Sequence, residues 1–317
     1  MIRHLSQPIL LAAFLTGWLQ AAPPVTVLGW SPDGHFLAVG RPRSIELLKP
    51  SSSHTPASRT NLALPKVCAL AFHPDGRHLW LAGGTPGESG ALLELNLPSL
   101  TQARRFDVRA DLVESISIHP DGQSLAHTDG NSIRQIMLPV GIASSVPFHS
   151  GHSGRILAIA HAPGAPFLLS VATDRSVKVW TDTTNAPVRS FGHHTEAPHA
   201  IAFQPGATLP TCATAGDDRT VRIWQPGIGR MVRIVRHHEG PILTLGYTPD
   251  GRRLYTAGTE GILRCLDASS DEILHSWAAS PDWINALAVH PVTGMIATGD
   301  ARGEVRLWNP DGSRMTP

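Results

Sequence analysis

The stretch ATDRSVKVW at residues 172–180 returns 44 residues later, nearly letter for letter, as GDDRTVRIW at residues 216–224. The end of each stretch alternates apolar and basic residues, and this period-two pattern is typical of a β-strand with one buried side. A catalytic loop needs to be encoded once, whereas a structural building block is encoded many times. The two copies therefore indicate that the chain is built from a repeated unit.

A turn centred on proline marks the same unit along the whole chain. It has a full Pro-Asp-Gly core at 30–34, 72–76, 118–122 and 247–251, and looser forms at 161–165, 203–207 and 289–294. Proline presets φ, aspartate bonds the nearby backbone, and glycine accepts a positive φ. Gaps of 42, 46, 43, 42, 44 and 42 residues separate the seven prolines, which are Pro32, Pro74, Pro120, Pro163, Pro205, Pro249 and Pro291. The chain thus contains seven units of nearly constant length.

Each unit contains strand patterns on both sides of its turn. An alternating apolar run precedes the turn, as in VCALAFHP (67–74), and a stretch with small residues follows it, as in RLYTAGT (253–259). A second alternating stretch such as TVRIW (220–224) completes the unit, and no segment after residue 21 has a convincing helical period. Three or four strands alone cannot bury both of their faces, but stacked units can. We therefore predict an all-β, seven-bladed β-propeller of four-stranded antiparallel blades over residues 22–317.

The first 21 residues have a different composition from the repeats. A basic start, MIRH, precedes the uncharged and mostly apolar run PILLAAFLTGWL at 8–19, and QAAPPV follows. This order is that of a secretory signal peptide cleaved after Ala21. The sequence therefore predicts an exported protein, periplasmic or extracellular. A buried N-terminal helix or strand and an uncleaved membrane anchor at 8–19 are the two alternatives, although a membrane span needs about 20 residues.

The charge balance excludes one large class of partners. The chain has 26 basic and 25 acidic residues and no run of Lys or Arg, so no nucleic-acid footprint is present. Its three cysteines, Cys68, Cys212 and Cys265, have neither redox nor zinc-binding spacing, and we expect them to be free, buried thiols.

At this point the repeat resembles the WD-repeat propeller family, over essentially all of residues 22–317. Its period matches the roughly 40–45 residues of that family. The resemblance implies four landmarks in each blade: a His, usually after Gly, before the first strand; a Ser or Thr in the second strand; an acid in the next turn; and a Trp in the third strand. It also implies that these side chains form a hydrogen-bonded chain that locks the blade.

These landmarks are clearest in the second half of the chain, and physically a buried carboxylate needs the donors that imidazole and hydroxyl groups supply. The expected blade-lock residues are His152, Ser170, Asp174 and Trp180 in blade four; His194 (or its neighbour His193), Thr214, Asp218 and Trp224 in blade five; His238, Thr256 and Glu260 in blade six; and Thr298 and Trp308 in blade seven. In blade seven the pattern places Ser280 at the His position and Arg302 at the acid position. Blades one to three keep the turn and the alternation but lack His and Trp.

The sequence is compatible with three ways of closing the ring. Family propellers usually pair a strand from one terminus into the last blade. Here residues 312–316 complete blade seven, or that blade is short, or an uncleaved N-terminal segment contributes.

No catalytic or cofactor motif stands out in the sequence. His152 with Asp174 and His194 with Asp218 look like His–Asp pairs, but they repeat at matched positions, as structural locks do. HHEGPIL (237–243) ends in Leu and lacks the second His of a zinc helix. His73, His119 and His290 share one turn position and are expected to be surface turn residues. We expect no metal site, no cofactor and no enzymatic activity.

A binding partner would meet the loops at one end of the central channel, because function in such folds lies in loops. Trp and Arg are favoured as binding hot spots. The residues expected on this face are Lys66, Leu112, Arg155, Thr173, Asp217, Asp282 and Trp283. The alternative for Trp283 is packing against a neighbouring blade. The sequence therefore predicts a non-catalytic protein-interaction scaffold. The alternative is a propeller enzyme or small-ligand binder acting at the channel mouth.

Overall fold

The computed structural model describes residues 22–50, 56–108, 111–138, 142–143, 149–181 and 186–315. The predicted signal peptide, residues 1–21, lies outside this part of the chain. No described segment is a helix long and apolar enough to cross a membrane.

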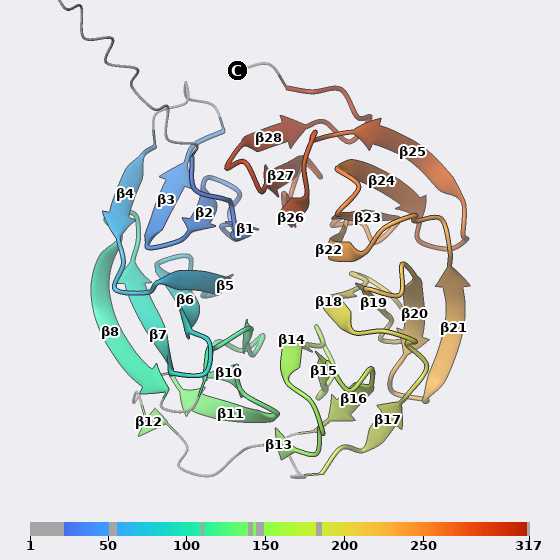
Figure 1. The fold of residues 1–317 in the computed structure, drawn as a ribbon, viewed down its shortest axis with the longest axis horizontal. Coiled ribbons are helices and arrows are strands. Elements are labelled where there is room, and N and C mark those ends of the chain that lie inside the picture. The colour runs from blue at the N-terminus through green and yellow to red at the C-terminus, as the bar shows by residue number, and fades with distance from the viewer. Residues whose placement is uncertain are drawn as a thin grey trace, which may run out of the picture.

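The described chain consists of β-strands and turns, and its strands form seven antiparallel sheets arranged as a ring (Figure 1). This confirms the predicted all-β, seven-bladed propeller. The first three blades are β1 (Val27–Trp30), β2 (Leu37–Arg41), β3 (Ser44–Leu48) and β4 (Ser58–Asn61); β5 (Lys66–Phe72), β6 (His78–Thr85), β7 (Ser89–Asn96) and β8 (Thr101–Val108); and β9 (Ile116–Ile118), β10 (Ser124–Asp129), β11 (Ser132–Met137), β12 (Ile142–Ala143) and β13 (His149–Ser150).

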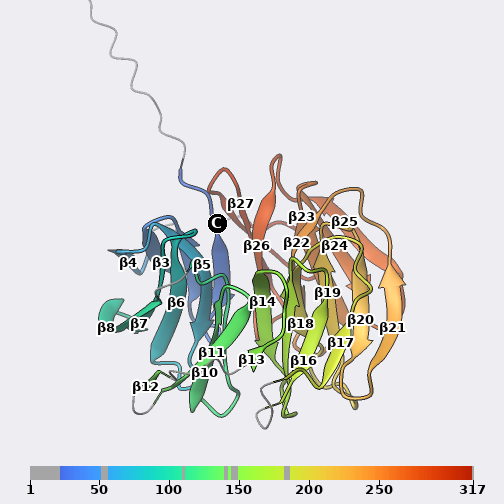
Figure 2. The same ribbon diagram turned by 60° about the horizontal axis from the view of Figure 1, so that its bottom comes forward.

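The second half of the ring continues with the same order of strands. Its blades are β14 (Ile156–His161), β15 (Leu168–Ala172), β16 (Val177–Trp180) and β17 (Arg189–Phe191); β18 (Pro198–Phe203), β19 (Cys212–Gly216), β20 (Val221–Gln225) and β21 (Arg230–Val235); β22 (Ile242–Tyr247), β23 (Arg253–Gly258), β24 (Ile262–Asp267) and β25 (Ile273–Ala278); and β26 (Ile284–Val289), β27 (Ile296–Asp300) and β28 (Val305–Trp308). The first strand of each blade lies next to the central channel, and the strands run between the two faces of the ring (Figures 1 and 2).

Blades three and seven form their outer edge differently from the others. In blade three, the two short strands β12 and β13 both pair with β11 and share the outer position. In blade seven, residues after β28 turn back along it. Trp308 forms a bridge with Arg314, and the Met315 N–H donates to Leu307 O at 2.9 Å. Of the three alternatives for the last blade, the C-terminal residues therefore complete its outer edge.

The ring closes through contacts between blades seven and one. The Trp30 indole on β1 donates to Ala288 O on β26 at 3.2 Å, and the Asn285 amide donates to Val25 O at 3.1 Å. The Val25 N–H also donates to Asp300 O at 3.1 Å. Among the described residues, closure therefore rests on packing and these hydrogen bonds between neighbouring sheets, without a strand from the N-terminal side entering blade seven.

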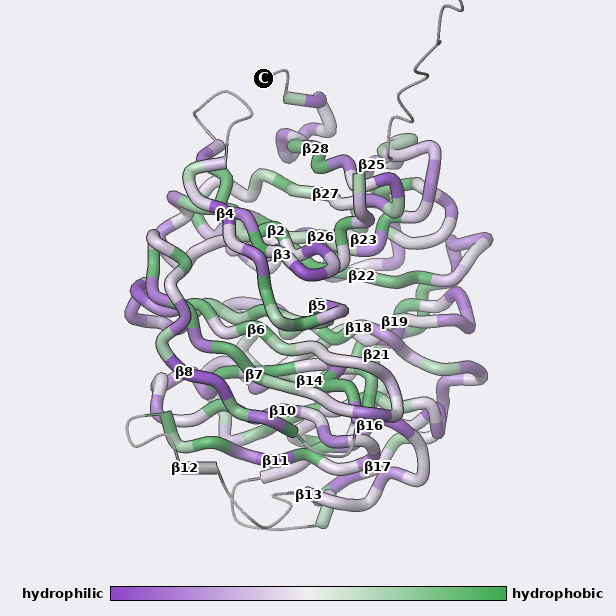
Figure 3. Tube along the Cα trace, turned by 60° about the vertical axis from the view of Figure 1, so that its left-hand side comes forward, coloured by the Kyte–Doolittle hydropathy of each residue, from purple (hydrophilic) through white to green (hydrophobic). Residues whose placement is uncertain are grey.

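The core lies between neighbouring blades. One buried cluster joins Ile45 and Leu47 of blade one to Leu79, Leu81 and Leu93 of blade two. Outer strands are more polar: β4 and β8 alternate exposed with partly buried residues, and Figure 3 shows hydrophilic colours along both. Each sheet thus buries its broad faces against its neighbours, which is the reason why the units must repeat.

The proline turns have the backbone that their glycines predict. The glycine φ lies between +68° and +75° in all seven turns, a region that side chains disfavour, at Gly34, Gly76, Gly122, Gly164, Gly206, Gly251 and Gly294. These turns join the first two strands of each blade, and we call the face that carries them the proline-turn face. The opposite face carries the loops before the inner strands, including Gly151-His152 and Gly192-His193, and we call it the Gly-His face.

Candidate interaction face

Blade four contains a continuous hydrogen-bonded chain beneath the Gly-His face. The His152 ring lies with Nδ1 2.9 Å from Asp174 Oδ2 and Nε2 2.7 Å from Ser170 Oγ. The Trp180 indole donates to the same Ser170 oxygen at 2.8 Å. Because an ionised carboxylate only accepts, Nδ1 carries the imidazole proton and the Ser170 hydroxyl donates to Nε2. Every member therefore has a partner.

Blade five repeats this chain with Thr in place of Ser. His194 Nδ1 lies 2.8 Å from Asp218 Oδ2, and His194 Nε2 lies 2.8 Å from Thr214 Oγ1. The Trp224 indole donates to Thr214 Oγ1 at 2.8 Å. Of the two adjacent histidines, His194 thus occupies the chain, whereas His193 is exposed and stacks on the Trp224 ring with centroids 5.8 Å apart.

The pKa values of the histidines and of Asp174 in these chains are lowered, as expected for a structural hydrogen-bonded pair. Burial lowers the pKa of His152 and His194, and their bonded carboxylates oppose this shift only in part. Burial alone raises the pKa of Asp174, but hydrogen bonds from Ser176 and His152 outweigh it and lower the pKa to about 2. Neutral imidazole therefore faces ionised carboxylate at neutral pH.

Blade six departs from the expected chain at its acid. The His238 Nε2 lies 2.8 Å from Thr256 Oγ1, as predicted. However, the Glu260 carboxylate accepts from the backbone N–H groups of Glu239 and Gly240 and from the Arg264 side chain. His238 Nδ1 has no hydrogen-bond partner in the structure. Glu260 thus takes the position of the acid without bonding the histidine.

Blade seven contains an acid that the sequence pattern did not identify. Arg302 does occupy the turn position, but the carboxylate comes from Asp300, two residues earlier. Asp300 Oδ2 accepts from the Ser280 hydroxyl at 2.7 Å and from Arg306 Nη1 at 2.7 Å. The Trp308 indole donates to Thr298 Oγ1 at 2.9 Å, as predicted. Serine is too short to reach both the acid and the threonine, so the chain is divided into two parts.

Sequence reasoning missed a second partner of the acids. A basic side chain two positions before the Trp position approaches the acid in three blades: Arg222 at 3.2 Å from Asp218, Arg264 at Glu260, and Arg306 at Asp300. Lys178 holds this position in blade four but donates to Ser190 Oγ instead, at 3.0 Å. The signal was available in the sequence, because a basic residue recurs there in VKVW, VRIW, LRCL and VRLW.

The cysteines show no sign of nucleophilic chemistry. All three are free, and burial raises the pKa of each thiol, to about 12 for Cys68. A reactive cysteine needs the opposite shift, because the thiolate is the nucleophile. These residues thus act as small apolar side chains in the inner and middle strands.

The expected face residues belong to paired loops on the Gly-His face. In blade four the Thr173 N–H donates to Arg155 O at 2.9 Å, and in blade seven the Ala301 N–H donates to Trp283 O at 2.9 Å. The same bond joins Asp217 to Ala197 in blade five at 2.9 Å. In these three blades the loop before the inner strand is therefore held beside the turn that follows the second strand.

Leu112 does not belong to this exposed face. Its side chain is 1% exposed and packs inward, so the expectation that it points outward is wrong. The neighbouring Asp111 supplies the surface group instead: its carboxylate accepts from the N–H groups of Gly87 and Leu112 at 2.7 Å each.

A charged arc covers one side of the channel mouth. Arg155 Nη1 lies 3.2 Å from Glu114 Oε1, and Arg155 Nε lies 3.7 Å from Asp111 Oδ2. Lys66 and Glu114 both act on the pKa of the Cys68 thiol, so each of these two side chains lies near that cysteine. Lys66, Asp111, Glu114 and Arg155 thus join blades two, three and four.

Trp283 stands apart from this arc in blade seven, two blades from Lys66 and three from Arg155 in the ring. Its side chain is 54% exposed, so it does not pack into a neighbouring blade. Asp282 accepts from the Trp283 N–H at 2.8 Å and lies 3.4 Å from Arg302 Nε. Asp217 and Thr173 are also exposed, and Asp217 Oδ1 lies 2.8 Å from His199 Nε2. The face therefore combines paired charges with one bare indole.

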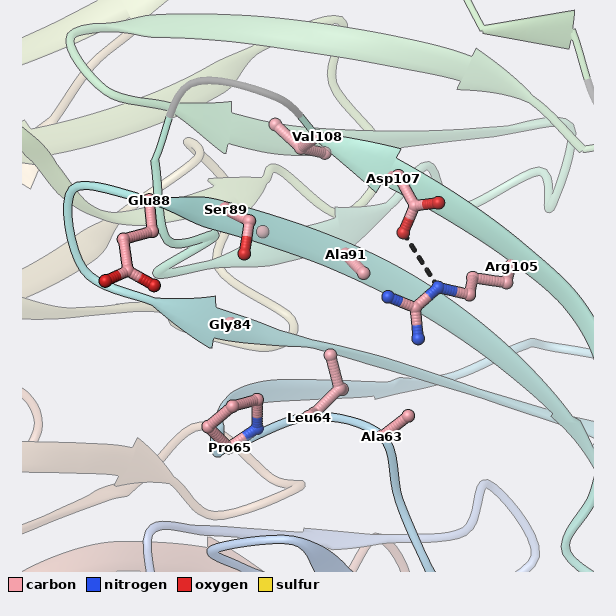
Figure 4. A pocket seen from close by; sticks show the side chains of 11 residues that line it. Ala63, Leu64, Pro65, Gly84, Glu88, Ser89, Ala91, Arg105, Asp107 and Val108 are labelled. Atoms are coloured by element: carbon pink, nitrogen blue, oxygen red, sulfur yellow. Dashed lines mark hydrogen bonds and ion pairs between the residues drawn. The ribbon is translucent and has the colours of Figure 1, made fainter.

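A cavity of about 290 Å³ lies toward the rim of this face, between the β4–β5 connection and blade two (Figure 4). Leu64 and Pro65 line one wall, while Glu88 and the Arg105–Asp107 pair line the other. The pair is joined at 2.7 Å, as the dashed line in Figure 4 shows. This cavity is lined by the connection to β5 and by outer strands, away from the channel mouth where a ligand was expected.

A comparison with known protein families identifies four of the repeats. The family model "WD domain, G-beta repeat" matches residues 144–181, 185–225, 229–267 and 271–309, which cover blades four to seven. Apart from the short outer strand β13, blades one to three lie outside these matches, in agreement with their missing His and Trp landmarks.

Three relatives show how far the similarity extends. Rat telomerase protein component 1 is 24% identical over 90% of this chain, and human WD repeat-containing protein 90 is 30% identical over 44%. The chain spans 9% and 8% of the length of these two proteins. A guanine nucleotide-binding protein subunit beta of Oryza sativa subsp. indica is 22% identical over 77% of this chain and 68% of its own length. With four matched repeats and seven blades, the chain belongs to the WD-repeat β-propeller family.

Proposed function

We propose that this propeller is a non-catalytic protein-interaction scaffold whose working surface is the Gly-His face. The observation that carries the proposal is Trp283: an indole that is 54% exposed, in a loop held by backbone hydrogen bonds. A large, rigid and partly apolar side chain held in place contributes binding energy at a small cost in conformational entropy. The similarity to a G-protein β subunit, named for its place in a complex, supports a role in assembly.

The charged arc on the other side of the channel mouth adds specificity to this surface. Arg155, Glu114 and Asp111 are paired with one another, so a partner must present matching charges in order to displace these contacts. A partner that spans the mouth would contact the arc and Trp283 at the same time. We therefore expect a folded protein or a long peptide of mixed charge, with an apolar patch that receives the indole.

Crosslinking and capture from the native host tests this proposal. The wild type is compared with Trp283→Ala/Arg155→Ala, which removes both sides of the face. The matched control is Ile228→Ala/Arg230→Ala on the β20–β21 turn of the opposite face, where Ile228 is 55% exposed. All three proteins must have equal melting temperatures before captured molecules are identified by mass spectrometry.

The outcomes test two things separately: whether the protein is an interaction scaffold, and whether the Gly-His face is its binding surface. A protein captured by the wild type and the control, but lost from the Trp283/Arg155 variant, supports both. Capture that is equal in all three proteins keeps the role and rejects the face. If none captures a protein, the scaffold proposal is rejected and a ligand-binding propeller takes its place.

We also propose that residues 1–21 direct export and are removed after Ala21. The support is the sequence pattern alone: a basic start, a 12-residue apolar run at 8–19 and small residues at the junction. The mass of the N-terminal peptide from the native host tests this. A mature chain beginning at Ala22 supports export with cleavage, whereas a retained residue 1–21 segment in the membrane fraction supports a tethered propeller.

A further inference from the structure

Three metal-ligating side chains meet at the turn between β5 and β6, on the proline-turn face. His73 Nδ1 lies 3.0 Å from Asp75 Oδ1, and His78 Nδ1 lies 2.8 Å from Asp75 Oδ2. One donor atom from each of the three residues lies within 4.8 Å of the others. All three side chains are partly exposed, between 20% and 34%, so an ion has access from solvent.

The proline turn itself does not explain this cluster. Blade three has the same turn with His119 and Asp121, whose Nδ1 and Oδ1 atoms lie 2.7 Å apart, but Ser124 stands where blade two has His78. In blade seven, backbone N–H groups of Val292 and Thr293 donate to His290 Nδ1, and no carboxylate is present in the turn. Only blade two among these turns combines two imidazoles with a carboxylate.

The hydrogen bonding of His73 sets the tautomer of its ring and leaves Nδ1 on the side of the cluster. His73 Nε2 lies 3.0 Å from Gly122 O of blade three, and a carbonyl only accepts, so Nε2 carries the proton. Nδ1 of the neutral ring is then an acceptor: it accepts from the Asp75 backbone N–H at 3.3 Å and lies 3.0 Å from Asp75 Oδ1. Metal-binding histidines commonly donate their second N–H to a backbone carbonyl in this way.

The ligand set selects the class of ion. Two imidazoles and one carboxylate suit Zn²⁺ and related borderline divalent metals, whereas Ca²⁺ and Mg²⁺ prefer oxygen ligands. With metal–ligand bonds of about 2.0–2.1 Å, donors around a tetrahedral ion lie roughly 3.3 Å apart. The two histidines approach different oxygens of Asp75, at 3.0 and 2.8 Å, and one donor atom from each residue lies within 4.8 Å of the others, so side-chain rotation must bring the three donors around the ion.

We propose that His73, Asp75 and His78 form a binding site for Zn²⁺ or a related divalent transition metal, with water completing the coordination. Because the His73 ring also bonds Gly122, the bound ion ties the turn of blade two to blade three. The site lies on the face opposite to Trp283. It is therefore independent of the proposed interaction surface.

Calorimetric titration of the full chain with ZnCl₂ at pH 7.5, in a buffer that does not chelate metals, tests the site. The chain has 17 histidines, so the comparison between variants decides the result. His78→Ser copies the residue that blade three has at this position and is expected to weaken binding at least tenfold. His78→Cys keeps a zinc ligand and is expected to retain binding. The matched control is His119→Ala, which alters the same turn in blade three.

The expected result is one Zn²⁺ per wild-type chain, the same in His119→Ala and His78→Cys, and lost or weakened in His78→Ser. Zn²⁺ is also expected to raise the melting temperature of the wild type but not of His78→Ser. Asp75→Asn adds a second test, although Asp75 also accepts from the Arg77 N–H at 2.7 Å and its loss perturbs the turn. Equal binding by the wild type and His78→Ser, or no binding by the wild type, would overturn the proposal.

Discussion

In the seventh blade the hydroxyl of Ser280 donates a 2.7 Å hydrogen bond to the carboxylate of Asp300. In blades four and five an imidazole makes the corresponding bond, to an acid that lies in the turn itself. The shorter serine thus meets an acid placed two residues earlier, at the end of β27. The same Asp300 carboxylate accepts from Arg306, so one buried acid stabilises both the entering loop and the third strand.

Mutation of Asp300 tests whether it takes the place of the turn acid. We expect Asp300→Ala to lower the free energy of unfolding by about 3 kcal/mol or more, because it leaves the buried Arg306 and the Ser280 hydroxyl without their acceptor. The control is Arg302→Ala, at the turn position that the repeat assigns to the acid. Its ion pair with Asp282 is exposed, so a change within about 1 kcal/mol is expected. Urea unfolding measures both, and a larger loss for Arg302→Ala would contradict the assignment.

In blade five, a buried acid and an exposed acid are adjacent in the sequence, so their contributions to stability can be compared directly. The Asp218 side chain is 0% exposed and accepts from His194, Thr220 and Arg222. Asp218→Ala leaves these groups unpaired and is expected to cost about 3 kcal/mol. Asp217→Ala removes only a surface contact with His199 and is expected to cost less than about 1 kcal/mol. Equal melting temperatures for the two variants would show that the hydrogen-bonded chain does not stabilise the blade.

Buried histidines predict a loss of stability in mild acid. Burial lowers the pKa of His161 and of His238 to about 4 each, against a usual value of 6.5 in the unfolded chain. Below pH 6.5 the unfolded state takes up protons that the native state cannot bind, so stability is complete above that pH and falls toward pH 4. Each histidine contributes on the order of 2–3 kcal/mol to this loss.

Urea midpoints measured at pH 7.5, 6.5, 5.5 and 4.5 follow this loss. His161→Gln removes one titrating group and is expected to flatten the profile, whatever its effect at pH 7.5. The matched control is His35→Gln, an exposed histidine on the β1–β2 turn, which is expected to leave the slope unchanged. A stability that is constant from pH 7.5 to 4.5 would rule out neutral burial of these rings.

The C-terminal segment is expected to stabilise blades six and seven. Pro310 O accepts from Arg253 and from the buried Tyr255, and Gly312, with φ +87°, lies against the Trp277 ring. A methyl group at Gly312 would overlap the indole, so Gly312→Ala is expected to cost about 1–3 kcal/mol. Ser313→Ala, which loses only exposed hydrogen bonds, serves as the control. Thermal unfolding with equal midpoints for both would show that the segment is not held there.

The sequence predicted the fold and the hydrogen-bonded chains of blades four and five because these depend on short-range patterns. Alternation identifies strands, and Pro-Asp-Gly identifies a turn that needs a positive φ, as at Gly76 and Gly251. His152 and Asp174 were found because their spacing is repeated by His194 and Asp218. Leu112 was expected on the surface from its place in the repeat, but its side chain is buried. Asp300 was missed because a serine and an earlier acid replaced the usual pair.

By itself, the sequence determined the number of blades, the strands within each and the residues of two complete hydrogen-bonded chains. These follow from local periodicity, which every unit repeats. Only the tertiary structure decided how blade one meets blade seven, that Asp300 replaces the turn acid, and that His78 joins His73 and Asp75. Such contacts depend on where loops place side chains in space, and an offset of one or two residues in a loop changes the partner without altering the strand pattern.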